Sequence, residues 1–136
     1  MRLLDLNVPA YLLSASLIAV LAQRLVRKIC PNCKREYEPP ASIKKSVEKL
    51  SGEVAKFYRG VGCKKCRNTG YAGRIAIHEL FVPNEEIMEL INERAGLRKL
   101  RDRALKNGMV PLQLDGIEKV KAAIVSIEEV LRTTSA

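Results

Sequence analysis

Two different spacings of apolar residues run along the chain and predict where strands and helices lie. A nearly continuous apolar stretch at 11–22 follows Pro9, which predicts a buried N-terminal helix. Apolar and polar residues then alternate over 23–29, which predicts a short strand. A second alternating stretch at 73–82 ends at Pro83 and predicts another strand.

The apolar period becomes helical after Pro83. Asn84 is placed to cap the first of four expected helices, and a third is expected over about 111–123. Ser126 followed by Glu129 has the spacing of a capping box on the last helix. These elements predict a compact C-terminal helical bundle.

Together the patterns predict a helix-rich α+β fold in three parts. Residues 1–29 are expected to hold the buried helix and a short strand, and 71–136 a return strand and the helical subdomain. Between them, 30–70 is expected to form an inserted lobe with a short helix after the break at Pro39–Pro40. With no tryptophan and 4% aromatic residues, Leu, Ile and Val must fill the interior.

The four cysteines form two matched pairs, Cys30–Cys33 and Cys63–Cys66, separated by residues 34–62. Two Cys-x-x-Cys turns supply the four soft ligands of a closed tetrahedral zinc site, so structural zinc is the favoured interpretation. Rubredoxin-type iron stays open because its spacing is similar, although Lys34 and Arg67 stand where that family usually has glycine. A redox dithiol and disulfides are the remaining alternatives.

Positive charge is concentrated around the cysteines. The chain carries +9 overall, and residues 24–74 hold 14 lysines and arginines against 4 acidic residues. Lys34, Lys64 and Lys65 are expected to offset the negative charge of a four-thiolate zinc centre. The alternative is a basic face for nucleic acid or anionic lipid, which the few aromatic residues make less favourable for single-stranded nucleic acid.

Other candidate chemistry is sparse. The single histidine, His78, is expected to be a half-exposed strand residue and not a ligand or base. The sequence contains no Gly-x4-Gly-Lys-Ser/Thr loop, no Gly-x-Gly-x-x-Gly, no His-Glu-x-x-His and no serine elbow, so no catalytic site is expected. The stretch at 11–22 lacks a basic leader and is shorter than a membrane span of about 20 residues, which predicts a reducing cytoplasm.

Five ordered strings are distinctive, and they extend over almost the whole chain, from about residue 3 to about 133. They are Leu3-Leu4-Asp5-Leu6, Val20-Leu21-Ala22-Gln23-Arg24-Leu25-Val26-Arg27, the four-cysteine insert, Thr69-Gly70-Tyr71-Ala72-Gly73-Arg74 with Ile77-His78-Glu79-Leu80, and Ile127-Glu128-Glu129-Val130-Leu131-Arg132. Together these strings resemble the carboxy-terminal part of type II secretion and type IV pilus assembly ATPases.

The resemblance implies a fragment of a cytoplasmic, hexameric P-loop (RecA-like) ATPase. Such ATPases dock on inner-membrane platform proteins and power a pseudopilus or pilus, and their ATP and magnesium site lies upstream of the matched part. This implies that the chain alone is inactive, with Cys30, Cys33, Cys63 and Cys66 as zinc ligands of a force-transmitting lobe. Gln23 and Arg24 match a recurrent family string but receive no catalytic role, because helix-end residues explain them equally. The alternative is a standalone zinc-ribbon-like protein that binds nucleic acid.

Overall fold

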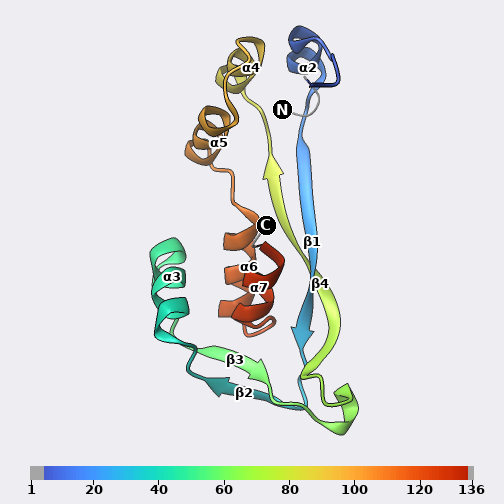
Figure 1. Ribbon diagram of the computed structural model, residues 1–136, viewed down its shortest axis with the longest axis vertical. Coiled ribbons are helices and arrows are strands. Elements are labelled where there is room, and N and C mark those ends of the chain that lie inside the picture. The colour runs from blue at the N-terminus through green and yellow to red at the C-terminus, as the bar shows by residue number, and fades with distance from the viewer. Residues whose placement is uncertain (1–4, 135–136) are drawn as a thin grey trace. The chain divides into compact units, whose positions relative to one another are not determined.

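A computed structural model describes residues 5–134 and divides them into two compact units (Figure 1). The first unit combines the described part of 1–22 with 79–111, and the second combines 23–78 with the described part of 112–136. Strands β1 (Val20–Ile29) and β4 (Tyr71–Phe81) pair in a two-stranded sheet, and each contributes residues to both units. The α+β class is therefore confirmed.

In its described part, the first unit contains the helices α2 (Ala10–Ser16), α4 (Glu85–Asn92) and α5 (Leu97–Lys106). Their apolar sides meet in one cluster, whose buried members are Leu13, Ile87, Leu90, Ile91, Leu100 and Ala104. The predicted cap is confirmed, because the Asn84 side chain accepts a hydrogen bond from the Ile87 amide at 3.1 Å. No helix within residues 5–134 is long and apolar enough to cross a bilayer.

The expectation of a buried helix through residue 22 is wrong. Only Leu13 and Ser14 of α2 are buried, whereas Tyr11 and Leu12 are exposed. Leu17 ends the helix in an extended conformation, and the chain from Val20 onward pairs with β4. A helix of seven residues has room for one buried stripe, so the continuous apolar pattern belongs to two different elements.

The second unit carries the cysteines. Strand β2 (Lys34–Tyr37) pairs antiparallel with β3 (Phe57–Gly60), and α3 (Ala41–Ser51) lies between them in the chain (Figure 1). A 3-10 turn, η1 (Lys64–Cys66), follows β3, and helices α6 (Leu112–Lys121) and α7 (Ile127–Thr134) complete the unit. The buried members of its main apolar cluster are Val26, Val47, Val54, Phe57, Ile77, Ile117, Val120, Val125, Ile127 and Val130.

This cluster joins the cysteine insert to the C-terminal helices. Val47 of α3 and Phe57 of β3 share it with Ile117 and Val120 of α6. Helices α4 and α5 belong to the first unit, whereas α6 and α7 belong to the second. The prediction of one compact C-terminal bundle is therefore wrong, because apolar contacts distant in sequence sort the four helices into two cores.

Candidate metal centre

The β2–β3 register brings the two cysteine turns together. Cys33 directly precedes β2 and Cys63 follows β3 by three residues, while Lys34 lies opposite Gly60 in the paired strands. Two backbone hydrogen bonds join the turns further, from the Cys30 amide to the Gly70 carbonyl at 2.9 Å and from the Val61 amide to the Cys33 carbonyl at 3.1 Å. Residues 33 positions apart are thereby held at one end of the sheet.

The four sulfur atoms lie at distances that suit a tetrahedral metal. All four are within 4.8 Å of one another. The Cys30–Cys63, Cys33–Cys66 and Cys63–Cys66 Sγ–Sγ distances are 3.9, 3.8 and 3.6 Å. Zinc with four sulfurs at about 2.3 Å requires sulfurs about 3.8 Å apart. The donor set and its spacing therefore fit zinc closely.

The alternatives to zinc find less support. The four cysteines are free, and their separations exceed the roughly 2 Å of a disulfide bond. Iron would accept the same tetrahedron of sulfurs. Among the described residues, however, no buried or partly buried aromatic side chain belongs to the cluster formed by the four cysteines, unlike the aromatic shell expected around a rubredoxin iron.

Backbone amides stabilise negative charge on Cys66. Its sulfur receives hydrogen bonds from the Cys63 amide at 3.2 Å and from the Gly70 amide at 3.3 Å. Burial raises the pKa of the Cys66 thiol, but these amides outweigh it and lower that pKa to about 6. Burial raises the pKa of Cys33 to about 11. A bound zinc ion would deprotonate both sulfurs.

Close backbone contact holds the second turn in place. A Cβ atom on Gly60 would lie 1.9 Å from the Gly70 carbonyl oxygen, and one on Gly70 would lie 2.4 Å from the Gly60 carbonyl oxygen. Arg67, Asn68 and Gly70 also have positive φ angles, which reverse the chain tightly after Cys66. The Asn68-Thr69-Gly70 segment thus explains why the amide of residue 70 reaches a sulfur.

The lysines expected to offset the thiolate charge have other partners or none. The Lys34 ammonium donates to the Ala123 carbonyl at 3.3 Å and lies 5.5 Å from the centre of the Tyr58 ring. Lys65 donates to Asn32 at 3.3 Å. Within the described part of the chain, no lysine or arginine hydrogen-bonds to a cysteine sulfur. Backbone amides therefore fill the close positions around Cys66.

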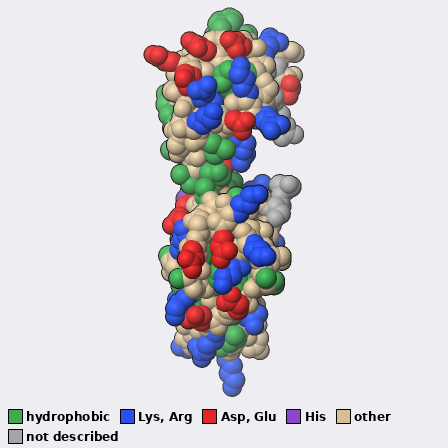
Figure 2. Space-filling view, turned by 90° about the vertical axis from the view of Figure 1, so that its left-hand side faces the viewer, with side chains coloured by type: hydrophobic (Ala, Val, Ile, Leu, Met, Phe, Trp, Pro, Cys, Tyr) green, Lys and Arg blue, Asp and Glu red, His purple; other side chains and the backbone are tan. Residues whose placement is uncertain are grey.

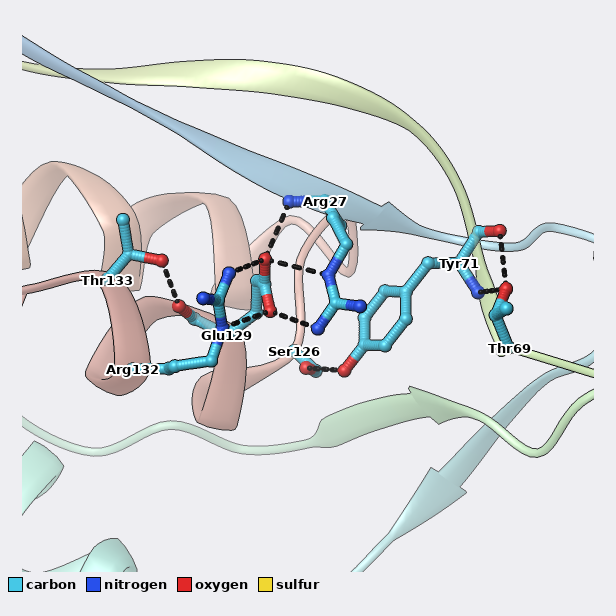
Figure 3. A network of polar contacts seen from close by, with 7 residues as sticks. All are labelled: Arg27, Thr69, Tyr71, Ser126, Glu129, Arg132 and Thr133. Carbon is cyan, nitrogen blue, oxygen red and sulfur yellow. Dashed lines mark hydrogen bonds and ion pairs between the residues drawn. The ribbon is translucent and has the colours of Figure 1, made fainter.

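A second polar site, which the sequence pattern did not predict, fixes α7 on β1 (Figure 3). The Glu129 carboxylate is 1% exposed and accepts two hydrogen bonds from the Arg27 side chain, at 3.0 and 2.8 Å, and one from the Arg27 amide at 3.1 Å. Arg132 adds two more, at 3.1 and 2.7 Å. In the sequence, the feature that could have predicted this site is a glutamate followed by the apolar residues Val130 and Leu131 in the last helix.

The predicted capping box at the start of α7 is wrong. Ser126 Oγ pairs with the Tyr71 hydroxyl at 3.3 Å, and the Glu129 carboxylate is occupied by the two arginines. The Arg27 guanidinium also lies over the Tyr71 ring, 4.1 Å from its centre. Both residues of the expected box therefore make long-range contacts, because the helix start is buried against β1 and β4 (Figure 3).

The remaining candidates lie outside the cysteine cluster. His78 is a half-exposed residue of β4, as expected, and its amide donates to Asp115 at 2.8 Å. Gln23 and Arg24 are exposed residues of β1, so their interpretation as helix-end residues is wrong. Strand pairing with β4 overrides the helical tendency of this stretch.

Comparison with known proteins decides the family. The profile described as Type II/IV secretion system protein matches residues 1–132. The chain belongs to this family. It is 40% identical over 133 residues to the type II secretion system ATPase E of Vibrio cholerae, and 39% identical over 135 residues to the type IV pilus assembly ATPase PilB of Thermus thermophilus. It is also 38% identical over 133 residues to the type II secretion system protein HxcR of Pseudomonas aeruginosa.

These family members are much longer than the region compared. Each alignment covers 98% of this chain, but 26%, 15% and 25% of the Vibrio, Thermus and Pseudomonas proteins, respectively. The chain therefore spans about a quarter or less of the length of these relatives. The resemblance seen in the sequence strings is confirmed for the family.

Proposed function

We propose that this chain is the C-terminal part of a cytoplasmic hexameric ATPase that powers type II secretion or type IV pilus assembly. Family membership over residues 1–132 and the names of the relatives support this function. ATP and magnesium bind in a P-loop, RecA-like core outside these 136 residues, consistent with the missing phosphate-loop motif. The chain alone then hydrolyses no ATP.

Zinc is the proposed cofactor, and its role is structural. Cys30, Cys33, Cys63 and Cys66 are the four ligands, and the single observation that supports this best is the 3.6–3.9 Å spacing of their sulfurs. Four protein ligands leave no open position for a substrate or an activated water. Zinc supplies a rigid cross-link between the ends of β2 and β3 when bound.

This cross-link suits force transmission. The β2–β3 pair shares its apolar cluster with α6, and Glu129 ties α7 to β1, so movement of one element carries the others. We assign the unit that contains the cysteines the role of passing ATP-driven movement to inner-membrane platform proteins. The protein then sits on the cytoplasmic face of that membrane, bound peripherally through these partners.

Metal analysis of the purified chain, followed by secretion assays with the full-length ATPase, tests the proposal. The purified chain is expected to contain one zinc per molecule and to be colourless, whereas red colour would indicate iron. Cys63→Ser with Cys66→Ser should abolish zinc binding, while the matched control His78→Ala should retain it. Introduced into the full-length ATPase, the double serine variant should stop secretion or piliation and H78A should not. Normal zinc content and secretion with both serines present would refute the proposal.

A further inference from the structure

The four cysteines differ in how far solvent reaches them. Cys30 and Cys33 of the first turn are 2% and 3% exposed, and Cys66 of the second turn is 7% exposed. Cys63 is the one of the four that is only partly buried. A small reagent that arrives from solvent therefore reaches Cys63 before the other three cysteines.

The surroundings of the second turn leave it open to solvent. Figure 1 shows η1 at the lower edge of the second unit, beyond the ends of β2 and β3. Lys64, Lys65 and Arg67, which flank Cys66, are all exposed. Figure 2 shows lysine and arginine side chains gathered at its lower end, where Figure 1 places the turn after β3. Flexible charged side chains thus surround the turn and leave Cys63 accessible.

Cys66 is held next to this accessible residue. The Cys63 and Cys66 Sγ atoms are 3.6 Å apart, whereas Cys30 and Cys63 Sγ are 3.9 Å apart. The amides of Cys63 and Gly70 donate to the Cys66 sulfur at 3.2 and 3.3 Å and fix its position. Cys-x-x-Cys is also the spacing of dithiols that alternate with disulfides. The second turn therefore combines an accessible sulfur with a fixed neighbour that can bond to it.

We propose that Cys63 and Cys66 form an oxidation site, at which hydrogen peroxide converts the two thiolate ligands into a disulfide and the zinc site is lost. This inference rests on the proposed function, because the reduced pair supplies two of the four proposed zinc ligands. Oxidation leaves only Cys30 and Cys33, and two cysteines do not complete a tetrahedral site.

The chemistry is a two-electron oxidation in two steps. The Cys63 thiolate attacks one peroxide oxygen, so that a sulfur–oxygen bond forms, the oxygen–oxygen bond breaks and the leaving hydroxide takes a proton to become water. The Cys66 thiolate then attacks the sulfur of the Cys63 sulfenic acid, so that the disulfide forms, the sulfur–oxygen bond breaks and a second hydroxide takes a proton. Two thiolates, one hydrogen peroxide and two protons thus give one disulfide and two waters.

A disulfide between the two turns is less favourable. The Cys30 amide donates to the Gly70 carbonyl at 2.9 Å, which fixes the first turn against the second. A Cys30–Cys63 bond must shift both of these backbone segments. Cys63 and Cys66 border the same short 3-10 turn, so their bond requires only a local change in η1.

The rest of the second unit is expected to stay folded on oxidation. Val47 and Phe57 pack with Ile117 in an apolar cluster whose buried residues include none of the cysteines. The change is therefore confined to the cysteine end, and a dithiol reductant with added zinc restores the site. The unit to which we assign force transmission thereby becomes reversibly sensitive to peroxide.

Zinc release and disulfide mapping on the zinc-loaded 136-residue chain test this site. Hydrogen peroxide is added beside a chromogenic chelator, with an untreated sample for comparison, and free thiols are then alkylated. Trypsin cleaves after Lys64 and Lys65, so a Cys63–Cys66 disulfide links two peptides that otherwise separate in mass spectrometry. One zinc is expected to leave for each such disulfide, and dithiothreitol with zinc should restore the original zinc content.

Three results of this experiment would overturn the oxidation site. They are zinc that stays bound in excess peroxide, a first disulfide that includes Cys30 or Cys33, and zinc loss that dithiothreitol does not reverse. Zinc content before peroxide separates these outcomes from failure of the proposed function. A purified chain without zinc contradicts the proposed function, whereas a chain whose zinc survives peroxide contradicts only the oxidation site.

Two matched histidine variants separate the roles of the sulfurs. Cys66→His and Cys33→His each keep three cysteines and one histidine, a set that binds zinc. In C66H the oxidation should stop at the Cys63 sulfenic acid, so that dimedone labels Cys63 about tenfold more than in wild type. In C33H the Cys63–Cys66 disulfide should still form. Equal dimedone labelling of the two variants would overturn the proposal, and if either variant binds no zinc, the wild-type mapping decides.

Discussion

Glu129 and Arg27 form a two-point ion pair between residues 102 positions apart in the sequence, with nitrogen–oxygen distances of 3.0 and 2.8 Å. The carboxylate is 1% exposed, whereas the guanidinium is 45% exposed and also stacks on Tyr71. The pair therefore places a fully enclosed charge at the join between α7 and β1. Its geometry is shown in Figure 3.

Replacing Glu129 by glutamine should lower the free energy of unfolding by about 1–3 kcal/mol, because the amide cannot accept the arginine hydrogen bonds as a charged carboxylate does. Urea unfolding of the zinc-loaded chain measures this loss. Glu118→Gln is the matched control, since Glu118 pairs with Lys121 at the surface and is 63% exposed. Its effect should stay below about 1 kcal/mol. Equal losses in both variants would contradict a special role for the buried carboxylate.

The same carboxylate predicts a pH dependence. Burial opposes ionisation of Glu129, but hydrogen bonds from Arg27 and Arg132 outweigh it and lower its pKa from 4.5 to about 2. A carboxyl with a lowered pKa in the folded state stabilises the fold above its unfolded pKa and loses that contribution as pH falls toward the folded value. The stability difference between wild type and E129Q should therefore shrink from pH 4.5 to about 2. A difference that stays constant over this range would contradict the prediction. Both proteins contain the same cysteines, so loss of any bound metal at low pH affects them alike.

Removal of zinc should loosen the cysteine end of the second unit before its apolar core. Val47 and Phe57 are held by the cluster that includes Ile117, whereas the proposed zinc would be the main cross-link of the turns at 30–33 and 63–66 beside two backbone hydrogen bonds. A chelator at neutral pH should raise amide hydrogen exchange most strongly at 30–33 and 60–70. Complete unfolding on zinc removal would show that the shared core does not hold α3 by itself.

Gly60 should not tolerate a side chain. Alanine at this position would bring its Cβ to 1.9 Å from the Gly70 carbonyl oxygen, which is backbone and can move aside only by opening the second cysteine turn. Gly60→Ala is expected to cost about 3 kcal/mol or more and to weaken zinc binding. Gly96→Ala is the control, because nothing lies within 4 Å of its Cβ position and its φ is −62°. Competition with a chromogenic chelator measures the zinc affinity of both variants.

The cap at Asn84 offers a test of the first unit. Asn84→Ala removes the acceptor of the Ile87 amide and should cost about 1 kcal/mol of stability. Asn84→Asp keeps an acceptor in the same place, so it should restore most of that loss. Thermal unfolding of the three proteins compares them. Alanine and aspartate variants of equal stability would show that the hydrogen bond contributes nothing.

Local patterns predicted the parts of this protein that short-range chemistry dictates. The Asn84 cap, the strand before Pro83, the helix after Pro40 and the matched cysteine pairs all follow from neighbours a few residues apart. The family strings likewise predicted the family correctly, since the profile of the secretion family matches residues 1–132. Each of these features follows from a short window of the chain.

Some residues fit a local interaction in the sequence but have a different, distant partner in the folded protein, and only the tertiary structure decided which one they contact. Ser126 and Glu129 fit a local capping box, but in the folded protein Ser126 contacts Tyr71 and Glu129 contacts Arg27. A buried carboxylate without an opposite charge costs more free energy than a helix start without a side-chain cap. The stretch at 20–22 likewise fits a helix until it pairs with β4. The sequence by itself determined these local elements, the paired spacing of the four cysteines and the family. Contacts between distant segments determined which core each helix joins, because burial and charge pairing depend on which elements meet in space.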